Sequence, residues 1–242
     1  MSEAKAAKPV AVPDYDRVWD EVYGDLQEVG PVHRHMKRLL REILGTVEYR
    51  SVLDVGCGFG HNLPLLTGDR DPLRLAGIDI SQRAIDHVSN EWNGEFHVLD
   101  AAKEQLDDRF DLVFSSLLLE HVPDDVAVLS GMREMCNRDL VVTTIAGDFE
   151  RHRPWEEQMG HVRNYAPGEL EAKLRAAGFE PQEVLYWGFP LYSPLARRLQ
   201  NRMKSTNEMS PATRALAHLM HAAYFLNSKR RGDLLIAHAR AV

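Results

Sequence analysis

Aspartates and glycines are spaced here in a way that suits the recognition of a nucleoside. The segment Val52–Gly60 reads as an apolar strand that carries Asp54 and runs into a glycine loop, and the next apolar run ends in Asp79. A strand, a glycine loop and a helix start, with an acid about 20 residues further on, form the nucleoside-binding half of open α/β folds. A dinucleotide fingerprint needs a third glycine where this chain has His61, so a pyrophosphate ligand is disfavoured.

Three carboxylates are expected at one edge of the predicted sheet. Asp54 precedes the glycines, and the next two strands end in Asp79 and Asp100. Ligands of open α/β sheets bind at the carboxyl ends of the strands, where these acids would meet. The negative electrostatic field of three carboxylates repels a polyphosphate and attracts a cation. S-adenosylmethionine fits, because it has a sulfonium, an ammonium and a ribose diol but no phosphate.

Five segments between about Arg50 and Phe179 carry a family resemblance. They are the glycine loop with Asp54, the strand end at Asp79, the pair Asp100-Ala101, the run Phe110–Asp124, and His161–Tyr165 followed by Glu169-Leu170 and Ala177-Gly178-Phe179. With these segments in this order, the chain resembles the class I S-adenosylmethionine-dependent methyltransferases, in particular their small-molecule branch of ubiquinone-type and natural-product enzymes. The resemblance implies a Rossmann-like, doubly wound sheet of seven mostly parallel strands with an antiparallel edge hairpin.

The resemblance also assigns residues to the cofactor. It implies that Asp79 binds the ribose hydroxyls, that Asp100 serves the adenine, and that Asp54 holds the loop amides and faces the methionyl ammonium. Capping of a neighbouring helix is the alternative for Asp79 and Asp100, and Cys57 is most simply a small residue that fills the loop. The full cofactor set is Asp54, Gly56, Cys57, Gly58, Gly60, Asp79, Ile80, Asp100, Ala101, Ser116 and Leu117.

Two histidines compete for the role of catalytic base. Methyl transfer requires a hydroxyl or ammonium acceptor to lose a proton, which a histidine with a pKa of about 6.5 can accept. His121 follows the fourth strand and His161 opens the segment after the fifth, and for each a structural role is the alternative. Trp155, in an expected loop, and Arg163 and Tyr165 are the predicted substrate contacts.

Missing residues narrow the reaction. Quinone-pathway enzymes of similar appearance carry Glu-x-x-Glu-His as metal ligands, but this chain has Leu117 before Glu120-His121, so no metal site is expected. The end of the fourth strand also lacks the Asn/Asp-Pro-Pro-aromatic motif that holds the exocyclic amine of a nucleic-acid base, so methylation of such amines is disfavoured. Metal-independent methylation of O or N on a small molecule remains. A non-catalytic scaffold that binds the cofactor is the alternative, and an NAD-dependent oxidoreductase is disfavoured because no Tyr-x-x-x-Lys pair is present.

Bulk properties are compatible with one α/β domain over residues 14–242 behind a flexible tail over residues 1–13. The chain has 242 residues, 44% of them hydrophobic, and a net charge of −7, which argues against a nucleic-acid binder. Cys57 and Cys136 are the only cysteines and suggest no disulfide or metal frame, so a reducing cytoplasm is expected. No transmembrane run or signal core is seen.

The coarse element pattern alternates strands and helices. A helical cap is expected over residues 14–48, with helices at 15–25 and 32–44. Strands are expected at 51–55, 74–78, 95–99, 110–115, 139–145, 184–187 and 234–239, with helices between them at 61–66, 81–91, 124–134 and 167–177.

A basic insert over residues 188–232 interrupts the last two strands. It carries eight lysines and arginines against the single acid Glu208 in an otherwise acidic chain. Two amphipathic helices are expected in it, at 191–203 and 216–223. They could pack on the sheet edge or a second subunit, which would make a homodimer and leave the arginines solvated. Alternatively they form a lid for an acidic or lipid-linked substrate, or a contact with an anionic membrane surface.

Overall fold

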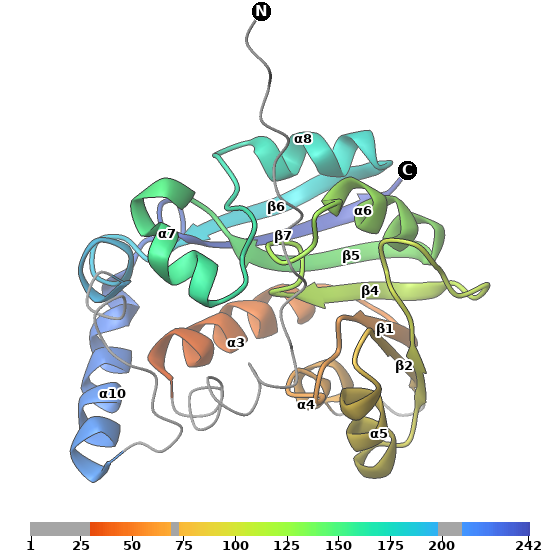
Figure 1. Cartoon of the computed structure of the whole chain (residues 1–242), viewed down its shortest axis with the longest axis horizontal. Helices are drawn as coiled ribbons and strands as arrows, with labels where there is room; N and C mark the ends of the chain where they lie inside the picture. The colour runs from red at the N-terminus through yellow and green to blue at the C-terminus, as the bar shows by residue number, and fades with distance from the viewer. Residues whose placement is uncertain (1–29, 69–72, 198–209) are drawn as a thin grey trace, which may run out of the picture.

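The computed structural model describes residues 30–68, 73–197 and 210–242, and it arranges them as a twisted sheet between helices (Figure 1). The sheet has seven strands in the order β3-β2-β1-β4-β5-β7-β6. The first five are parallel, whereas β7 is antiparallel to both β5 and β6. The predicted doubly wound sheet is therefore confirmed. The strands are β1 (Ser51–Val55), β2 (Arg74–Asp79), β3 (Glu95–Val98), β4 (Phe110–Ser116), β5 (Cys136–Ile145), β6 (Phe179–Trp187) and β7 (Leu234–Ala241).

Two apolar cores lie on the two faces of the sheet. Successive side chains of a strand point to opposite faces, so Val52 of β1 belongs to one core and Leu53 to the other. The first core is covered by α3 (Pro31–Leu44), α4 (Leu63–Thr67), α5 (Gln82–Glu91) and α10 (Pro211–Ala223). The second is covered by α6 (Asp125–Glu134) and α8 (Glu169–Ala176). The remaining elements are α7 (Phe149–Gln158), the π-helical turn η2 (Tyr192–Ala196) and the 3-10 turn η3 (Tyr224–Leu226).

The edge strand β6 is longer than predicted. It begins at Phe179 rather than at residue 184, and its first half exposes Glu180, Gln182 and Glu183. Pro181 adjoins an irregularity in the pairing with β7. Proline and polar residues are tolerated on an edge strand because one side of it makes no ladder, and this is why the segment reads as a loop in the sequence.

The segment after β5 contains a helix that was expected to be a loop. Helix α7 begins after Asp148, whose side chain accepts a hydrogen bond from the amide of Arg151. Arg153 pairs with Glu150 and Glu157 on successive turns. The sequence did not predict this helix, because Pro154 lies inside it and proline normally ends a helical pattern. The predicted loop residue Trp155 therefore lies on a helix.

The insert differs from its predicted form. Helix α10 packs through Ala217, whereas Leu216 and Leu219 of the predicted apolar stripe are 54% and 69% exposed. A hydrogen bond between the ring of His35 and the carbonyl of His221 ties α10 to α3. The predicted tail at 1–13, the helix at 15–25 and most of the first insert helix lie outside the described residues. Among the described residues, no helix combines the length and apolar character that crossing a bilayer requires.

Candidate functional site

The glycine loop after β1 is folded in a way that glycine makes possible. Gly56, Gly58 and Gly60 have φ angles of 76°, 51° and 78°, which lie in the left-handed region that favours glycine. The amides of Gly56 and Cys57 both donate to the carbonyl of Ile78, at 2.8 and 3.1 Å. The loop is therefore fastened to the carboxyl end of β2. Cys57 is buried and burial raises the pKa of its thiol, which agrees with a space-filling role.

Asp79 joins the glycine loop to the start of α5. Its Oδ2 accepts from the amide of Gly58 at 2.9 Å, and its Oδ1 accepts from the amide of Ser81 at 2.9 Å. Ser81 in turn caps α5 by accepting from Ala84, as predicted. The prediction that Asp54 holds the loop amides is wrong, because neither oxygen of Asp54 accepts a hydrogen bond from the described residues and Asp79 accepts from the amide of Gly58.

Asp54 is a buried carboxylate whose two oxygens have no hydrogen-bond partner among the described residues. Its exposed fraction is 1%, and burial, followed by the charge of Asp79, raises its pKa to about 8. An unpaired buried charge is costly, and a cation placed beside it removes that cost. The ammonium or sulfonium of S-adenosylmethionine supplies such a cation, so the residues of this edge fit the cofactor.

The rest of the cofactor edge is more exposed. Ile80 is an apolar side chain that is 51% exposed beside Asp79. Asp100 accepts from the amide of Ala102, next to Ala101, and pairs with Lys103 at 2.6 Å. The hydrogen bond from Lys103 lowers the pKa of Asp100. Asp100 therefore caps a turn at residues 101–103, so the alternative that it caps a helix is wrong, and its adenine contact stays a prediction.

The end of β4 is strained next to the glycine loop. Leu117 has a φ of 56° and is the only non-glycine residue with positive φ in the described ranges. Its amide donates to the carbonyl of Thr143 at 2.8 Å, which fixes this conformation. Ser116 places its hydroxyl 3.9 Å from the sulfur of Met36 on α3. Strain of this kind persists where the surrounding structure holds it, often at a functional site.

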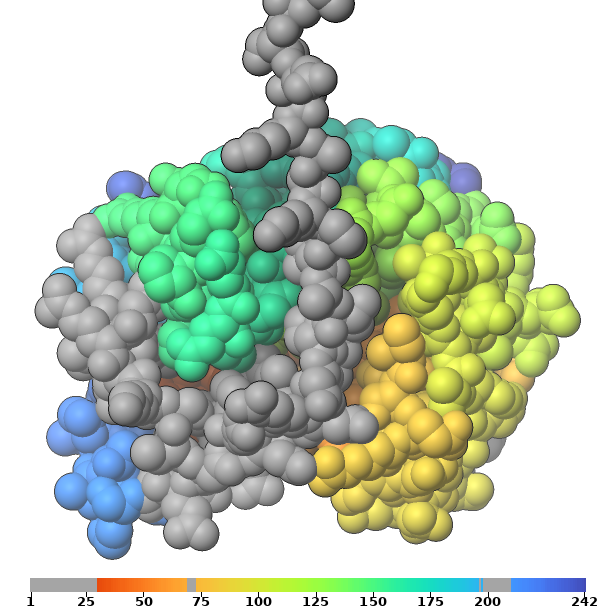
Figure 2. Space-filling model, viewed as in Figure 1, coloured from red at the N-terminus to blue at the C-terminus, as the bar shows by residue number. Residues whose placement is uncertain are grey.

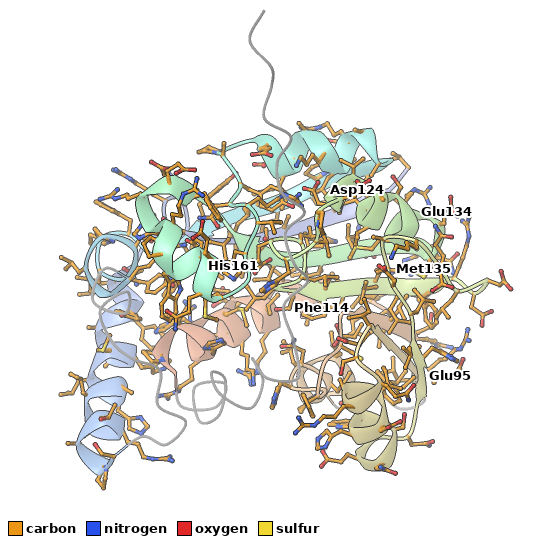
Figure 3. All side chains as sticks on the ribbon, in the orientation of Figure 1. Glu95, Phe114, Asp124, Glu134, Met135 and His161 are labelled. Carbon is orange, nitrogen blue, oxygen red and sulfur yellow. The ribbon has the colours of Figure 1, made fainter. Side chains whose placement is uncertain are left out.

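The two candidate bases lie together. The rings of His121 and His161 are 4.7 Å apart between centroids and nearly perpendicular. His161 lies close to α7, whereas Glu95 and Met135 mark the opposite end of the strands (Figure 3). The Nδ1 of His121 lies 3.3 Å from the carbonyl of Gly160. Burial, followed by the charge of His161, lowers the pKa of His121 to about 3.

His161 is paired with a buried glutamate that sequence reasoning missed. Its Nδ1 lies 2.6 Å from Oε2 of Glu156, which is fully buried on α7. Burial alone would raise the pKa of Glu156, but the hydrogen bond from His161 and the charge of Arg197 hold it below its usual value. Arg197 is itself 3% exposed, so the prediction of solvated arginines in the insert is wrong for this residue.

A second acid adjoins the two histidines. Oε2 of Glu120 accepts from the hydroxyl of Thr144 at 2.8 Å, whereas its buried Oε1 has no hydrogen-bond partner within the part of the chain that the structure describes. Burial raises the pKa of Glu120. Ligand atoms of Glu120, His121 and His161 lie within 4.8 Å of one another, a set that could hold a divalent ion. The sequence did not predict this arrangement, because His161 lies in a different loop from Glu120 and His121.

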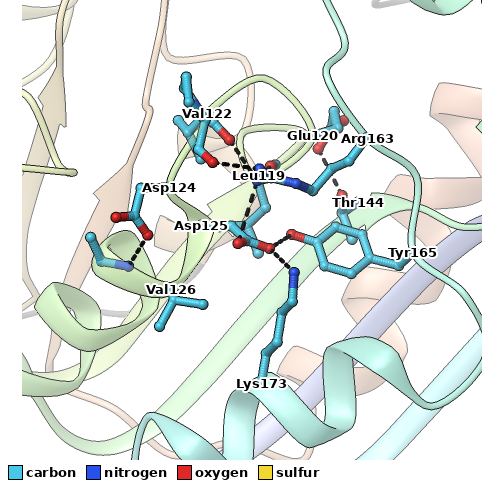
Figure 4. A network of polar contacts seen from close by, with 12 residues as sticks. Leu119, Glu120, Val122, Asp124, Asp125, Val126, Thr144, Arg163, Tyr165 and Lys173 are labelled. Atoms are coloured by element: carbon cyan, nitrogen blue, oxygen red, sulfur yellow. Dashed lines mark hydrogen bonds and ion pairs between the residues drawn. The ribbon is translucent and has the colours of Figure 1, made fainter. Parts of the chain in front are cut away.

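Arg163 and Tyr165, two of the predicted substrate contacts, instead support the segment that follows β4 (Figure 4). The hydroxyl of Tyr165, which is fully buried, donates to Asp125 at 2.6 Å, and Lys173 pairs with the same carboxylate at 2.7 Å. Arg163 donates to the carbonyls of Leu119 and Pro123. The structure therefore gives Arg163 and Tyr165 the task of holding the segment after β4, in place of the expected substrate contact. Trp155 is partly exposed on α7, and its substrate contact stays a prediction.

Comparison with known proteins identifies the family. The family described as Methyltransferase domain matches residues 30–184, which is more than half of the chain. The chain belongs to this methyltransferase family. Its fold is that of the class I S-adenosylmethionine-dependent methyltransferases, and S-adenosylmethionine is the cofactor that this family uses.

Two curated relatives are similar over part of their length. A ubiquinone biosynthesis O-methyltransferase of Hydrogenovibrio crunogenus is 24% identical over 140 residues, which is 53% of this chain and 56% of the relative. A trans-aconitate 2-methyltransferase of Azoarcus sp. is 24% identical over 175 residues, 67% of this chain and 64% of the relative. In both cases the match spans less than two thirds of the relative.

Solved structures share the fold over almost the whole chain. The methyltransferase in complex with the Haloferax volcanii Trm112 methyltransferase activator has a TM-score of 0.64 at 18% identity, covering 96% of this chain and 97% of that one. The magnesium protoporphyrin IX methyltransferase of Synechocystis PCC 6803 with bound SAH has a TM-score of 0.60 at 18% identity, covering 94% of each chain. At these identities the likeness shows the fold alone.

Proposed function

We propose that the protein methylates an oxygen or nitrogen of a small-molecule metabolite without a metal ion, and that His161 accepts the proton of the acceptor. The observation that carries this proposal is the 2.6 Å contact between Nδ1 of His161 and the buried carboxylate of Glu156. A carboxylate in this position fixes the ring tautomer and stabilises the imidazolium that forms. The second ring nitrogen, Nε2, is then the proton acceptor.

The surroundings of the two histidines distinguish their roles. A general base works best when its pKa lies near the operating pH. His121, with a pKa of about 3, is a weak base and stays neutral. We therefore assign proton acceptance to His161 and orientation of the acceptor to His121.

The remaining residues bring the reactants together. Bound S-adenosylmethionine supplies an electrophilic methyl group. In the proposal Asp54 faces its positive charge and Asp79 its ribose, while His121 and His161 hold the acceptor at the adjoining strand end. Alignment of two reactants in this way is worth about 7–11 kcal/mol of the barrier.

The proposed acceptor is a small molecule rather than a nucleic acid. The net charge of −7 disfavours a polyanion, and the names of two relatives specify ubiquinone biosynthesis and trans-aconitate. An acidic or lipid-linked metabolite agrees with the basic insert, which would lie on the acceptor side.

A panel of phenols, carboxylates and amines, assayed with methyl-labelled S-adenosylmethionine, tests the proposal. Transfer to one class, lost in His161→Gln but with cofactor affinity retained, is the expected result. Tight cofactor binding without transfer to any acceptor would favour the scaffold alternative. Full activity of His161→Gln would contradict the assignment of the base.

A metal-assisted route is a second candidate, supported by the unpartnered Oε1 of Glu120 beside the two histidines. A divalent ion held there would bind an acceptor oxygen and lower its pKa. Dialysis against a chelator, followed by activity assay and metal analysis with added zinc or manganese, separates the routes. Unchanged activity in the metal-free protein supports the proposed route, and activity that returns only with metal supports the second.

A further inference from the structure

We infer that Arg197 is a positioning residue for the reaction, acting on His161 through Glu156. This makes the insert between β6 and β7 part of the catalytic machinery rather than an appended surface. The inference rests on the proposed function, in which His161 is the base. It concerns how that base is held, so it can fail while the base assignment stands.

Arg197 bridges two acids from different parts of the chain. It follows η2 in the insert, and its side chain is 4% exposed. One nitrogen of its guanidinium pairs with Glu156 on α7, and the other donates to Asp233 at 2.7 Å. A planar guanidinium suits this task, because its fork offers two donors in a fixed geometry.

The two oxygens of Glu156 have different partners. Oε1 accepts from Arg197 and from the side-chain amide of Asn164 at 3.0 Å. Oε2 accepts from Nδ1 of His161. Two donors on one oxygen fix the plane of the carboxylate and so aim the other oxygen at the imidazole. The backbone adds a further link, because the amide of His161 donates to the carbonyl of Glu156 at 2.8 Å.

The contact with Glu156 also sets the tautomer of His161. A carboxylate oxygen can only accept, so the ring proton of His161 lies on Nδ1 and Nε2 is left unprotonated. Without Arg197 the plane of this carboxylate is no longer fixed, so this tautomer loses its support. The other ionisable groups near the pair include Glu120, His121, His152, Tyr192 and Asp233.

The insert is fastened to the sheet at the same place. The hydroxyl of Ser193 in η2 accepts from the amide of Asp233 at 2.9 Å. The carbonyl of Asp233 accepts from the amide of Ala146, at the end of β5. Asp233 thus anchors the insert whether or not Arg197 reaches Glu156, which provides a matched control.

Three variants of the full-length protein separate positioning from anchoring. Arg197→Met removes the charge at similar length, Arg197→Lys restores a charge, and Asp233→Asn weakens the ion pair between Arg197 and Asp233 but leaves the Arg197–Glu156 pair and the backbone contacts of residue 233. The tautomer of His161 is read from imidazole nitrogen shifts by NMR, with His161→Gln to assign the signals. His238, which pairs with Asp139 at 2.8 Å, is the internal reference. Circular dichroism confirms that each variant is folded.

In Arg197→Met, we expect His161 to lose the tautomer in which Nδ1 is protonated and Nε2 is not. In Arg197→Lys and Asp233→Asn, we expect His161 largely to keep this tautomer. With an acceptor from the panel, kcat of Arg197→Met falls at least tenfold, while the Kd for S-adenosylmethionine and KM stay within twofold. If Asp233→Asn changes the His161 signals as much as Arg197→Met, Arg197 is only an anchor. An unchanged tautomer in Arg197→Met also overturns the inference. Full activity of His161→Gln would instead refute the proposed function.

Discussion

The cofactor side and the acceptor side of this site are built in different ways. On the cofactor side, Asp79 binds Gly58 and Ser81, partners that lie 21 and 2 residues away. On the acceptor side, Arg197 reaches Glu156 across 41 residues and Tyr165 reaches Asp125 across 40. In the proposed function, binding of the cofactor therefore depends mainly on residues that are close in the sequence, whereas the acceptor chemistry depends on contacts between distant segments that exist only after folding.

The geometry reflects this division. Segment α4–α5 and helix α7 are seen on the same face of the molecule (Figure 2). The strained end of β4 at Leu117 adjoins the glycine loop, since a Cβ at Gly56 would lie 3.2 Å from Leu118. It also adjoins His121, whose amide donates to the carbonyl of Leu118 at 2.9 Å. The two halves should therefore respond independently to mutation, except close to this point.

The largest expected effect is on the acceptor side. Replacement of His161 by Gln removes the proton acceptor, and kcat should fall by about 10²–10⁴-fold, the usual contribution of a general base. The Kd for S-adenosylmethionine should stay within twofold in calorimetry. The exposed His97 on β3, replaced by Gln, is the control. A matching loss of cofactor affinity in His161→Gln would show that the cofactor side and the acceptor side do not respond separately to mutation.

The second effect is on stability. Tyr165→Phe removes a buried hydroxyl that donates to the charged Asp125, so the free energy of unfolding should fall by about 1.5–3 kcal/mol. Urea unfolding followed by fluorescence measures it. Because the hydroxyl supports the loop after β4, kcat should fall with little change in cofactor affinity. A variant as stable as the wild type would show that this network does not hold the loop.

The sequence predicted the cofactor side well because its signals are local. Positive φ angles demand glycines at 56, 58 and 60, and Ser81 caps α5 where the pattern placed it. It did not predict that Glu156 and Arg197 would meet, because no periodicity links a helix after β5 to an insert after β6. Arg163 and Tyr165 were predicted to contact the substrate, and only the structure shows that they hold the segment after β4.

The third effect is on the cofactor. Asp79→Ala removes both the predicted ribose contact and the acceptor for the amide of Gly58, so cofactor affinity should fall at least about tenfold, since hydrogen bonds to a charged group contribute about 1.5–3 kcal/mol each. Calorimetry with S-adenosylhomocysteine measures it, with Asp100→Ala as a comparison from the same edge. An unchanged Kd would remove the ribose assignment.

The smallest expected effect is a pH dependence. The pKa of Asp54 is raised to about 8 in the folded state, above its unfolded value. Its contribution to the stability of the cofactor-free protein is therefore present at low pH and is lost as the pH rises toward about 8. Asp54→Asn should remove this slope and gain at least about 1 kcal/mol of stability at pH 8. It should also weaken cofactor binding.

Thermal unfolding of wild type and Asp54→Asn between pH 5 and pH 9, without cofactor, checks the sign. Parallel curves for the two proteins would mean that Asp54 is not an unpaired buried charge. A steeper loss in Asp54→Asn would contradict the account in the same way.

A crystal structure with S-adenosylhomocysteine is the most direct test of the proposed cofactor side and acceptor side. The account predicts ribose hydroxyls bonded to Asp79, the ammonium beside Asp54, and the sulfur directed toward His121 and His161. An adenosyl group bound away from Asp54 and Asp79, or a sulfur directed away from the two histidines, would contradict it.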